Sequence, residues 1–202
     1  MSTLIIHPKD PTTDFLKPIY APIRDKTVIT GGVSIPELRE LIKSYHRVIM
    51  LGHGTPMGLL SVGQFEGRFF VIDDSFSELL SEKRDNIFIW CYASEFMSYN
   101  QLCGFGTGMF ISEIEEAHYF NFLDVSQNLI DESNNCFATI MSRYIDQLLD
   151  VLFENVLHEY GKLAKTNPIA KFNFERLYFS LSNNVLQTET NDNVHKMNCF
   201  KS

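Results

Sequence analysis

Two short apolar runs decide how this chain folds: VIMLGHG at residues 48–54 and IFIWC at residues 87–91. Neither run alternates apolar and polar residues, as a half-exposed strand would, and each is shorter than a typical helix. Continuous apolar runs of this kind are typical of strands that are covered on both faces of a sheet. The first run leads into His53 and the second ends in Cys91. The sequence therefore predicts two buried strands whose ends carry an imidazole and a thiol.

Strand and helix patterns alternate along the first 120 residues. Ser34, followed by Glu37 three positions later, forms a capping box in the sequence and marks the start of one helix. The alternation predicts an α/β fold, a three-layer sandwich in which helices flank a central, mostly parallel sheet. Besides the two opening runs, strands are expected at residues 4–7, 27–30 and 69–72, and helices after residue 12, after residue 34, over 75–84 and over 112–120.

The segment 136–164 carries a different pattern. Its apolar side chains recur about every four residues, whereas an ideal helix repeats every 3.6 residues, so the apolar stripe drifts around the helix. Three explanations stay open: burial on several sides, a break in the helix, or contact of one part with another subunit. After Pro168, the aromatic residues Phe172, Phe174 and Tyr178 predict a late strand.

Composition argues against several classes of protein. The 202 residues are 45% hydrophobic, which suits a single domain, expected over residues 1–182, with a polar tail at 183–202. The net charge is −8 and no basic stretch could follow a phosphate backbone, so no nucleic-acid partner is expected. No apolar run approaches the roughly 20 residues that a membrane span requires. The four scattered cysteines show neither a C-x-x-C pair nor zinc-ligand spacing, so we expect reduced thiols, a cytoplasmic location and no metal or cofactor.

The pair of His53 and Cys91 has the chemistry of a cysteine hydrolase. A thiol is a weak nucleophile until it loses its proton, and a nearby imidazole can take that proton. Sites in open α/β sheets form beyond the carboxyl ends of the strands, where both residues are expected. The N–H groups of Gly54 and Cys91 could hold an oxyanion there. The alternative, a buried strand thiol and an unrelated turn histidine, stays open.

Four segments follow one another along the chain: VIMLGHGTPMGLL (48–60), FVIDDSFSELL (70–80), NIFIWCYASEFM (86–97) and GFGTGMFISEIEEA (104–117). Their order resembles that of the caspase-like cysteine peptidases, which include metacaspases and the bacterial CHAT domains. In this group one apolar strand ends in His-Gly and a second ends in the nucleophilic cysteine. The segment 70–80 looks like the metacaspase stretch between these motifs. The resemblance covers residues 1–120 and the remainder only loosely.

The resemblance implies a caspase-like fold and a role for each residue of the site. His53 would be the catalytic base and Cys91 the nucleophile, with the backbone N–H groups of Gly54 and Cys91 as oxyanion hole. The reaction would be hydrolysis of a peptide bond through a thioester, and the partner would be a peptide or protein substrate. A homo-oligomer or a regulatory protein partner stays open.

Two departures from the family leave specificity and activity open. Metacaspases carry an aspartate two residues before the nucleophile, where this chain has Ile89, and Cys91 is followed by Tyr92 rather than by an early glycine. The alternative function is a catalytically silent caspase-like module that binds a partner protein. A flavodoxin-like ligand-binding domain is a weaker alternative, because residues 8–11 do not resemble a phosphate-binding loop.

Four residues are candidates for substrate binding: Asp10, Thr13, Asp73 and Asp74. Asp10 and Thr13 lie on the loop after the first predicted strand and could line the substrate cleft, although a turn with a helix cap also explains them. Asp73 and Asp74 could bind a cation or a basic side chain, or could simply cap a helix. The remaining carboxylates near the last segment of the resemblance, Glu113, Glu115 and Glu116, are predicted to be a solvated helix face.

Overall fold

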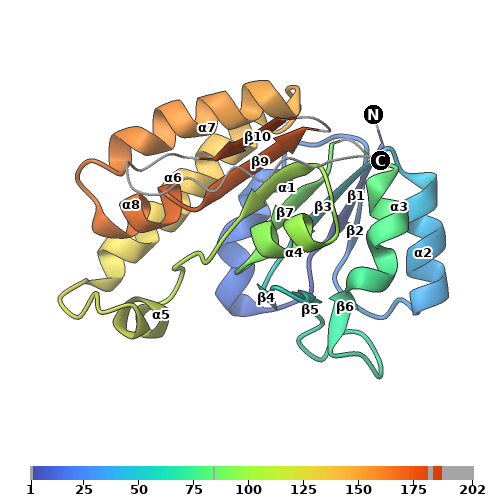
Figure 1. Ribbon diagram of the computed structural model, residues 1–202. Helices are drawn as coiled ribbons and strands as arrows, with labels where there is room; N and C mark the ends of the chain where they lie inside the picture. Colours follow the sequence, from blue (N-terminus) through green and yellow to red (C-terminus); the bar gives the residue numbers. More distant parts are fainter. Residues whose placement is uncertain (1, 84, 182–183, 188–202) are drawn as a thin grey trace.

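The two apolar runs form neighbouring strands in the middle of one sheet. The computed structural model describes residues 2–83, 85–181 and 184–187. The sheet has seven strands in the order β10-β9-β8-β7-β3-β1-β2 (Figure 1). The strands β2, β1, β3, β7 and β8 run parallel to one another, β9 runs antiparallel to β8, and β10 antiparallel to β9. The strands are β1 (Thr3–Ile6), β2 (Lys26–Ile29), β3 (Arg47–Leu51), β7 (Ile87–Ile89), β8 (Gly104–Thr107), β9 (Leu177–Leu181) and β10 (Asn184–Gln187).

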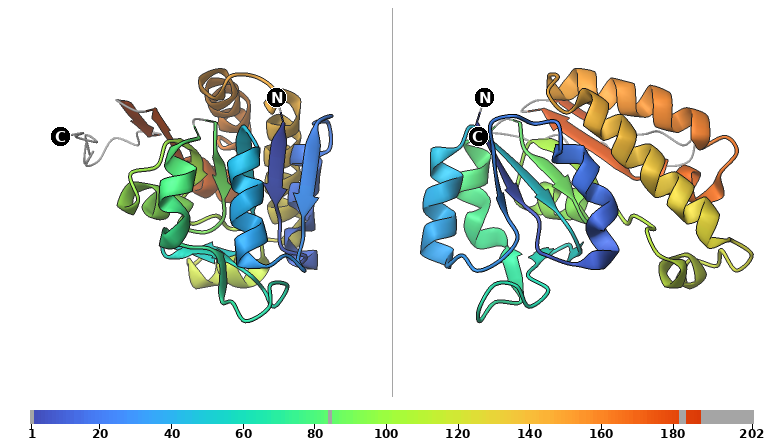
Figure 2. Two further views of the ribbon diagram at one scale, coloured as in Figure 1. Left: turned by 90° about the vertical axis from the view of Figure 1, so that its right-hand side faces the viewer. Right: turned by 180° about the vertical axis from the view of Figure 1, so that it is seen from behind.

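Helices cover both faces of the sheet, which makes the α/β three-layer arrangement expected from the sequence. Successive side chains of a strand point to opposite faces, so Ile49 and Leu51 of β3 pack into one core and Val48 and Met50 into the other. Figure 2 shows α1, α6 and α7 on one side of the sheet and α2 and α3 on the other. The first group is η1 (Pro11–Leu16), α1 (Lys17–Tyr20), α6 (Gln127–Tyr144) and α7 (Leu149–Leu163), and the second is α2 (Ile35–Ser44), α3 (Ser77–Ser81) and α4 (Ala93–Tyr99).

A third, smaller apolar cluster lies beyond the sheet. It joins α5 (Ile114–Tyr119) to α8 (Pro168–Phe174) through Ile111, Ala117 and Ile169, all fully buried. None of the helices in the described part of the chain has the length and hydropathy that crossing a bilayer requires.

A small antiparallel sheet follows β3 directly. It consists of β4 (Gly54–Thr55), β5 (Gly58–Leu60) and β6 (Phe70–Ile72), in that order. The expected strand at 69–72 therefore exists but belongs to this second sheet, after which η2 (Asp74–Phe76) leads into α3. Gly58 turns the chain with φ of 145°, and a Cβ atom there would lie 2.0 Å from the Ile72 carbonyl oxygen, so only glycine fits.

Of the three explanations for the drifting stripe at 136–164, the structure shows a break. The helix α6 ends at Tyr144 and α7 begins at Leu149. The guanidinium of Arg47, which is 2% exposed, donates to the Ile145 carbonyl at 2.6 Å and reaches Asp146 at 3.4 Å. At the break, the Ile145 carbonyl just after α6 has no partner within the helix and accepts a hydrogen bond from the buried Arg47 at the start of β3.

The late strand begins later than the aromatic pattern predicts. Phe172 and Phe174 lie in α8, and only Tyr178 lies in a strand, β9, so the strand prediction for the first two residues is wrong. Asn167 explains the helix, because its side chain accepts hydrogen bonds from two backbone N–H groups of the first turn and is followed by proline. Of the predicted tail, residues 184–187 form β10, and residues 188–202 lie outside the described residues.

Shortening a buried side chain of β3 tests this architecture. Leu51→Ala should lower the free energy of unfolding by about 2–5 kcal/mol, because Leu51 is fully buried in the core beneath α1 and α6. The measurement is urea denaturation followed by far-UV circular dichroism. The matched control is Leu148→Ala, whose leucine is 70% exposed and should change the stability by less than about 0.5 kcal/mol. Equal losses in the two variants would contradict the assignment of the core.

Candidate active site

His53 and Cys91 meet at one small cavity. Each follows its strand by two residues, β3 ending at Leu51 and β7 at Ile89. Because the strands are parallel neighbours, both residues reach the same edge of the sheet. They line a cavity of about 20 Å³ together with Thr13, Phe15, Leu16, Gly52, Ile89, Trp90, Phe110 and Ser112. Among the described residues no hydrogen bond joins the imidazole to the thiol, although the two share this cavity.

The hydrogen bonds of Thr12 determine which nitrogen of His53 carries the hydrogen. The Thr12 hydroxyl donates to the Asp10 carboxylate at 2.8 Å, and its oxygen lies 2.6 Å from Nε2 of His53. A hydroxyl has one proton, so its oxygen accepts the hydrogen bond from His53. Nε2 therefore carries the hydrogen, and Nδ1 keeps the lone pair that a general base needs.

Asp10 holds this arrangement in place as the N-cap of η1. Its carboxylate accepts from the backbone N–H of Thr12 at 3.0 Å, and this bond lowers the pKa of Asp10. The second carboxylate oxygen lies 3.8 Å from Nε2 of His53. The helix cap predicted from the sequence is thus present, and the same cap places a negative charge beside the imidazole. A role of Asp10 in substrate binding stays a prediction.

A buried histidine, His7, forms hydrogen bonds with the loop that carries Asp10, Thr12 and Thr13. His7 is 3% exposed, and its ring lies 3.0 Å from the Thr13 hydroxyl and 3.1 Å from the Tyr20 hydroxyl. Because Thr13 donates to the Asp10 carbonyl, Nε2 of His7 must be the donor to Thr13. Burial lowers the pKa of His7 to about 4, so its ring is neutral. Thr13 therefore lines the cavity while its hydroxyl is engaged in this network.

Cys91 stands at the turn between β7 and α4. The next residue, Tyr92, has φ of 68°, a left-handed conformation that ends the strand sharply, and α4 starts at Ala93. The thiol donates to the Phe110 carbonyl at 3.5 Å and reaches the Glu116 carboxylate at 3.9 Å. Burial, and next the charge of Glu116, raise the pKa of Cys91 to about 12. In this conformation Cys91 is therefore a thiol and not a thiolate.

Trp90, which precedes Cys91, contacts the loop that carries His53. Its indole N–H donates to the Thr55 carbonyl at 3.2 Å. A Cβ atom on Gly54 would lie 2.0 Å from the indole ring, so the backbone of Gly54 passes directly over Trp90. This contact places Gly54 beside the strand end that carries Cys91. The N–H of Cys91 donates to no backbone carbonyl among the described residues. The backbone N–H groups of Gly54 and Cys91 therefore lie at the same edge of the sheet.

Asp73 and Asp74 lie away from the cavity. Asp73 caps η2 by accepting from the Ser75 N–H, and it forms an ion pair with Arg68 at 2.7 Å. Neither aspartate is among the residues that line the cavity of His53 and Cys91. The structure therefore shows the helix cap for Asp73, Asp74 lies in the first turn of η2, and a role of either in substrate binding stays a prediction.

Glu116 lies beside Cys91, a position that the sequence does not predict. The expectation of a solvated face describes Glu115, which is exposed, but not Glu116, whose carboxylate faces Cys91 and accepts from the backbone N–H groups of Ser112 and Glu113. Burial, and next the charge of Glu116, also raise the pKa of Glu113. The sequence pattern E-x-x-E at the start of α5 matches a capping box, which indicates that the Glu116 carboxylate turns toward the backbone of the helix start.

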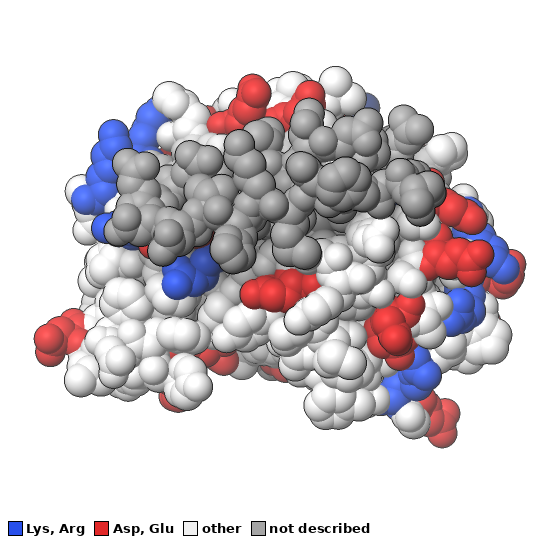
Figure 3. All heavy atoms as spheres, viewed as in Figure 1, with Lys and Arg blue, Asp and Glu red and all other residues white. Residues whose placement is uncertain are grey.

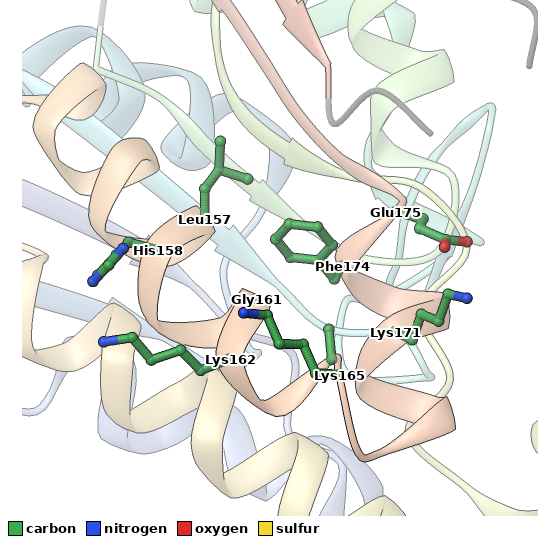
Figure 4. A pocket seen from close by; sticks show the side chains of 9 residues that line it. Leu157, His158, Gly161, Lys162, Lys165, Lys171, Phe174 and Glu175 are labelled. Atoms are coloured by element: carbon green, nitrogen blue, oxygen red, sulfur yellow. The ribbon is translucent and has the colours of Figure 1, made fainter. Parts of the chain in front are cut away.

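A larger cavity of about 490 Å³ lies between α7 and α8, away from the cysteine (Figure 4). Its floor is apolar, with Leu157 and Phe174, and its rim carries His158 and three lysines. Figure 4 shows the amines of Lys162 and Lys171 on opposite sides of the Phe174 ring, so the charges do not converge on one point. Figure 3 shows basic side chains gathered at this end of the molecule, while acidic and basic side chains alternate over α2 and α3.

Comparison with known protein families, with curated proteins and with solved structures found no match to this chain. No group of three or more histidine, cysteine or acidic side chains in the described part of the chain could hold a metal ion. The site therefore rests on the geometry of His53, Cys91 and their neighbours.

The buried neutral ring of His7 predicts an acid-sensitive fold. Its pKa is about 4 when folded and 6.5 when unfolded, so the unfolded chain binds more protons below pH 6.5 and stability falls as the pH drops. Between pH 7 and pH 4.5 this residue should remove about 2 kcal/mol of stability. Chemical denaturation at both pH values should show this loss, and His7→Gln should lack it. The exposed His118 is the control, and a loss in His118→Gln smaller than in wild type would contradict the assignment.

Proposed function

We propose that this protein is a caspase-like cysteine endopeptidase that hydrolyses peptide bonds with His53 as base and Cys91 as nucleophile. The observation that carries the proposal is the shared cavity of the two residues, with Nδ1 of His53 left as base by the hydrogen bonds of Thr12. The order of the motifs along the sheet supports the caspase-like assignment, because the His-Gly strand and the cysteine strand are adjacent and parallel. A cytoplasmic location is proposed from Cys91 and Cys136, which form no disulfide.

The reaction would begin with transfer of the thiol proton from Sγ of Cys91 to Nδ1 of His53. The thiolate attacks the carbonyl carbon of the scissile peptide, and the N–H groups of Gly54 and Cys91 stabilise the oxyanion that forms. The imidazolium returns its proton to the leaving amine as the C–N bond breaks, which leaves a thioester on Cys91. A water molecule, activated by His53, then hydrolyses the thioester.

Asp10 and Thr12 would support the charged state of this cycle. When His53 gains a proton at Nδ1, the Nε2–H bond to Thr12 persists and the carboxylate of Asp10 lies 3.8 Å away. Because burial weakens screening by solvent, this negative charge stabilises the imidazolium. The arrangement performs the same task as the acidic member of a catalytic triad, with a hydroxyl interposed between acid and base.

The lining of the cavity favours an apolar substrate side chain. Ile89, Phe15 and Leu16 contribute apolar side chains around the thiol. Ile89 stands where metacaspases carry an aspartate, so a basic side chain would find no carboxylate at that position. The substrate class we propose is a peptide or protein with a small apolar residue before the scissile bond.

One observation favours a second candidate, a catalytically silent caspase-like module that binds a partner protein. The thiol of Cys91 donates to the Phe110 carbonyl and contacts the Glu116 carboxylate, and burial together with the charge of Glu116 raises its pKa and opposes its ionisation. If this conformation persisted in solution, the protein would bind peptides without cleaving them, as a homo-oligomer or with a regulatory partner.

Replacement of the nucleophile separates the two candidates. Cys91→Ala should abolish cleavage of a peptide library with apolar residues, whereas Cys136→Ala, which removes a half-buried cysteine on α6, should leave it within about twofold. The measurement is mass spectrometry of the products. Cleavage by wild type that survives in Cys91→Ala would contradict the proposed mechanism, and absence of cleavage by wild type favours the silent module.

Removal of the Thr12 hydroxyl tests the base assignment. Thr12→Val keeps the shape of the side chain but breaks the link from Asp10 to His53, so kcat should fall roughly 10-fold to 100-fold with little change in KM. The control is Thr166→Val, an exposed threonine at the end of α7, with unchanged kcat expected. An unchanged kcat in Thr12→Val would contradict the tautomer derived for His53.

A further inference from the structure

The surroundings of the Cys91 thiol oppose the loss of its proton. The S–H group lies 3.5 Å from the Phe110 carbonyl oxygen and 3.9 Å from the Glu116 carboxylate, in a buried position that disfavours the charged sulfur. A carboxylate beside the sulfur also repels the negative charge of a thiolate. The proposed base, His53, is held by Thr12 and makes no hydrogen bond with the thiol in the described residues.

Glu116 is fastened to the segment that closes the cavity. One carboxylate oxygen faces Cys91, and the other accepts from the N–H of Ser112 at 2.7 Å and from the N–H of Glu113 at 3.2 Å. The Ser112 hydroxyl adds a third bond at 3.1 Å. These bonds join the start of α5 to the residues before it, so Glu116 and Ser112 must move together.

Buried amides anchor this segment from behind. The side chain of Asn173 pairs with both backbone groups of Ile111, accepting from its N–H at 2.7 Å and donating to its carbonyl at 2.9 Å. Asn134 donates to the Ser112 carbonyl at 2.9 Å, and its own carbonyl oxygen is buried without a partner. Phe110 packs against Phe137 of α6, with ring centroids 5.0 Å apart. The segment is thus held against Cys91 from the α6 and α8 side.

The cavity is too small for a substrate while this segment is in place. A volume of about 20 Å³ is close to that of one water molecule. A reacting carbonyl carbon has to come within roughly 3–3.5 Å of the sulfur, so residues that line the cavity, Phe110 and Ser112 among them, must move aside to admit it. Because Glu116 is bonded to Ser112, that movement also draws the carboxylate away from the thiol.

We propose that residues 110–116 form a latch that holds Cys91 in its protonated, latent state, and that occupation of the cavity by a peptide releases it by carrying Glu116 away. This inference rests on the proposed function, since it describes the regulation of the same site. On release, the proton of Sγ moves to Nδ1 of His53, which gives a thiolate and an imidazolium with no change in total charge. The latch couples substrate binding to activation and protects the thiol in the empty protein.

Alkylation of Cys91 by iodoacetamide at pH 7.5 tests the latch without any peptide. Glu116→Gln removes the negative charge and turns an amide donor toward the sulfur, so the alkylation rate of Cys91, read by peptide mass spectrometry, should rise at least tenfold, about one unit of thiol pKa. The matched control is Glu115→Gln, an exposed neighbour on the same helix, whose rate should stay within twofold of wild type. A Glu116→Gln variant that alkylates no faster than wild type overturns the latch.

A second variant keeps the test decisive if Glu116→Gln does not fold. Asn134→Ala removes only one anchoring bond and one unpartnered oxygen, and it should raise the alkylation rate at least threefold while circular dichroism stays native. An unchanged rate in the folded variant overturns the latch.

The two proposals fail separately in this design. Cleavage of peptides that depends on Cys91, together with an unchanged alkylation rate in Glu116→Gln, would keep the peptidase and remove the latch. A raised alkylation rate with no peptide cleavage by either protein would keep the latch and favour the silent module. His53→Ala, introduced into Glu116→Gln, should reverse the gain in rate if His53 accepts the proton.

Discussion

The parallel pairing of β3 with β7 is the constraint on which the rest of the site depends. Ile49 pairs with Ile87 and Leu51 with Ile89, and this register sets how far His53 and Cys91 extend beyond the sheet. A slip by one residue would turn one of the two side chains to the opposite face. The cores on both sides prevent such a slip, because every residue of the two strands is buried. Packing of apolar side chains therefore determines the geometry of a polar site.

The parts of the fold that are encoded locally could be predicted from the sequence. The runs at β3 and β7 need no distant partner to be identified as buried strands, and the capping box of Ser34 and Glu37 forms as expected. The break between α6 and α7 could not be placed, because it depends on Arg47, about a hundred positions earlier in the chain. Phe172 and Phe174 have strand-like composition, but the cap by Asn167 makes their segment a helix.

The candidate site was likewise predictable only in part. His53, Cys91 and Gly54 follow apolar strands, and that position alone places them at one edge. Thr12 contacts His53 and Glu116 contacts Cys91 from distant segments, and the local E-x-x-E pattern indicates only the capping box of Glu116. The two nearby carboxylates contact different members of the proposed pair: Asp10 is linked to His53 through Thr12, whereas Glu116 contacts Cys91 and disfavours the charged sulfur.

The passage of Gly54 over Trp90 also limits how this chain can vary. With only 2.0 Å between the indole and a Cβ atom at residue 54, residue 54 cannot gain a side chain beside Trp90 without moving the loop that carries His53. A larger residue at 54 is compatible with the fold only where residue 90 is smaller. A smaller residue at 90 would in turn give up the indole bond to Thr55. Any sequence that diverges from this one by gaining a side chain at 54 is therefore expected to have lost the indole at 90.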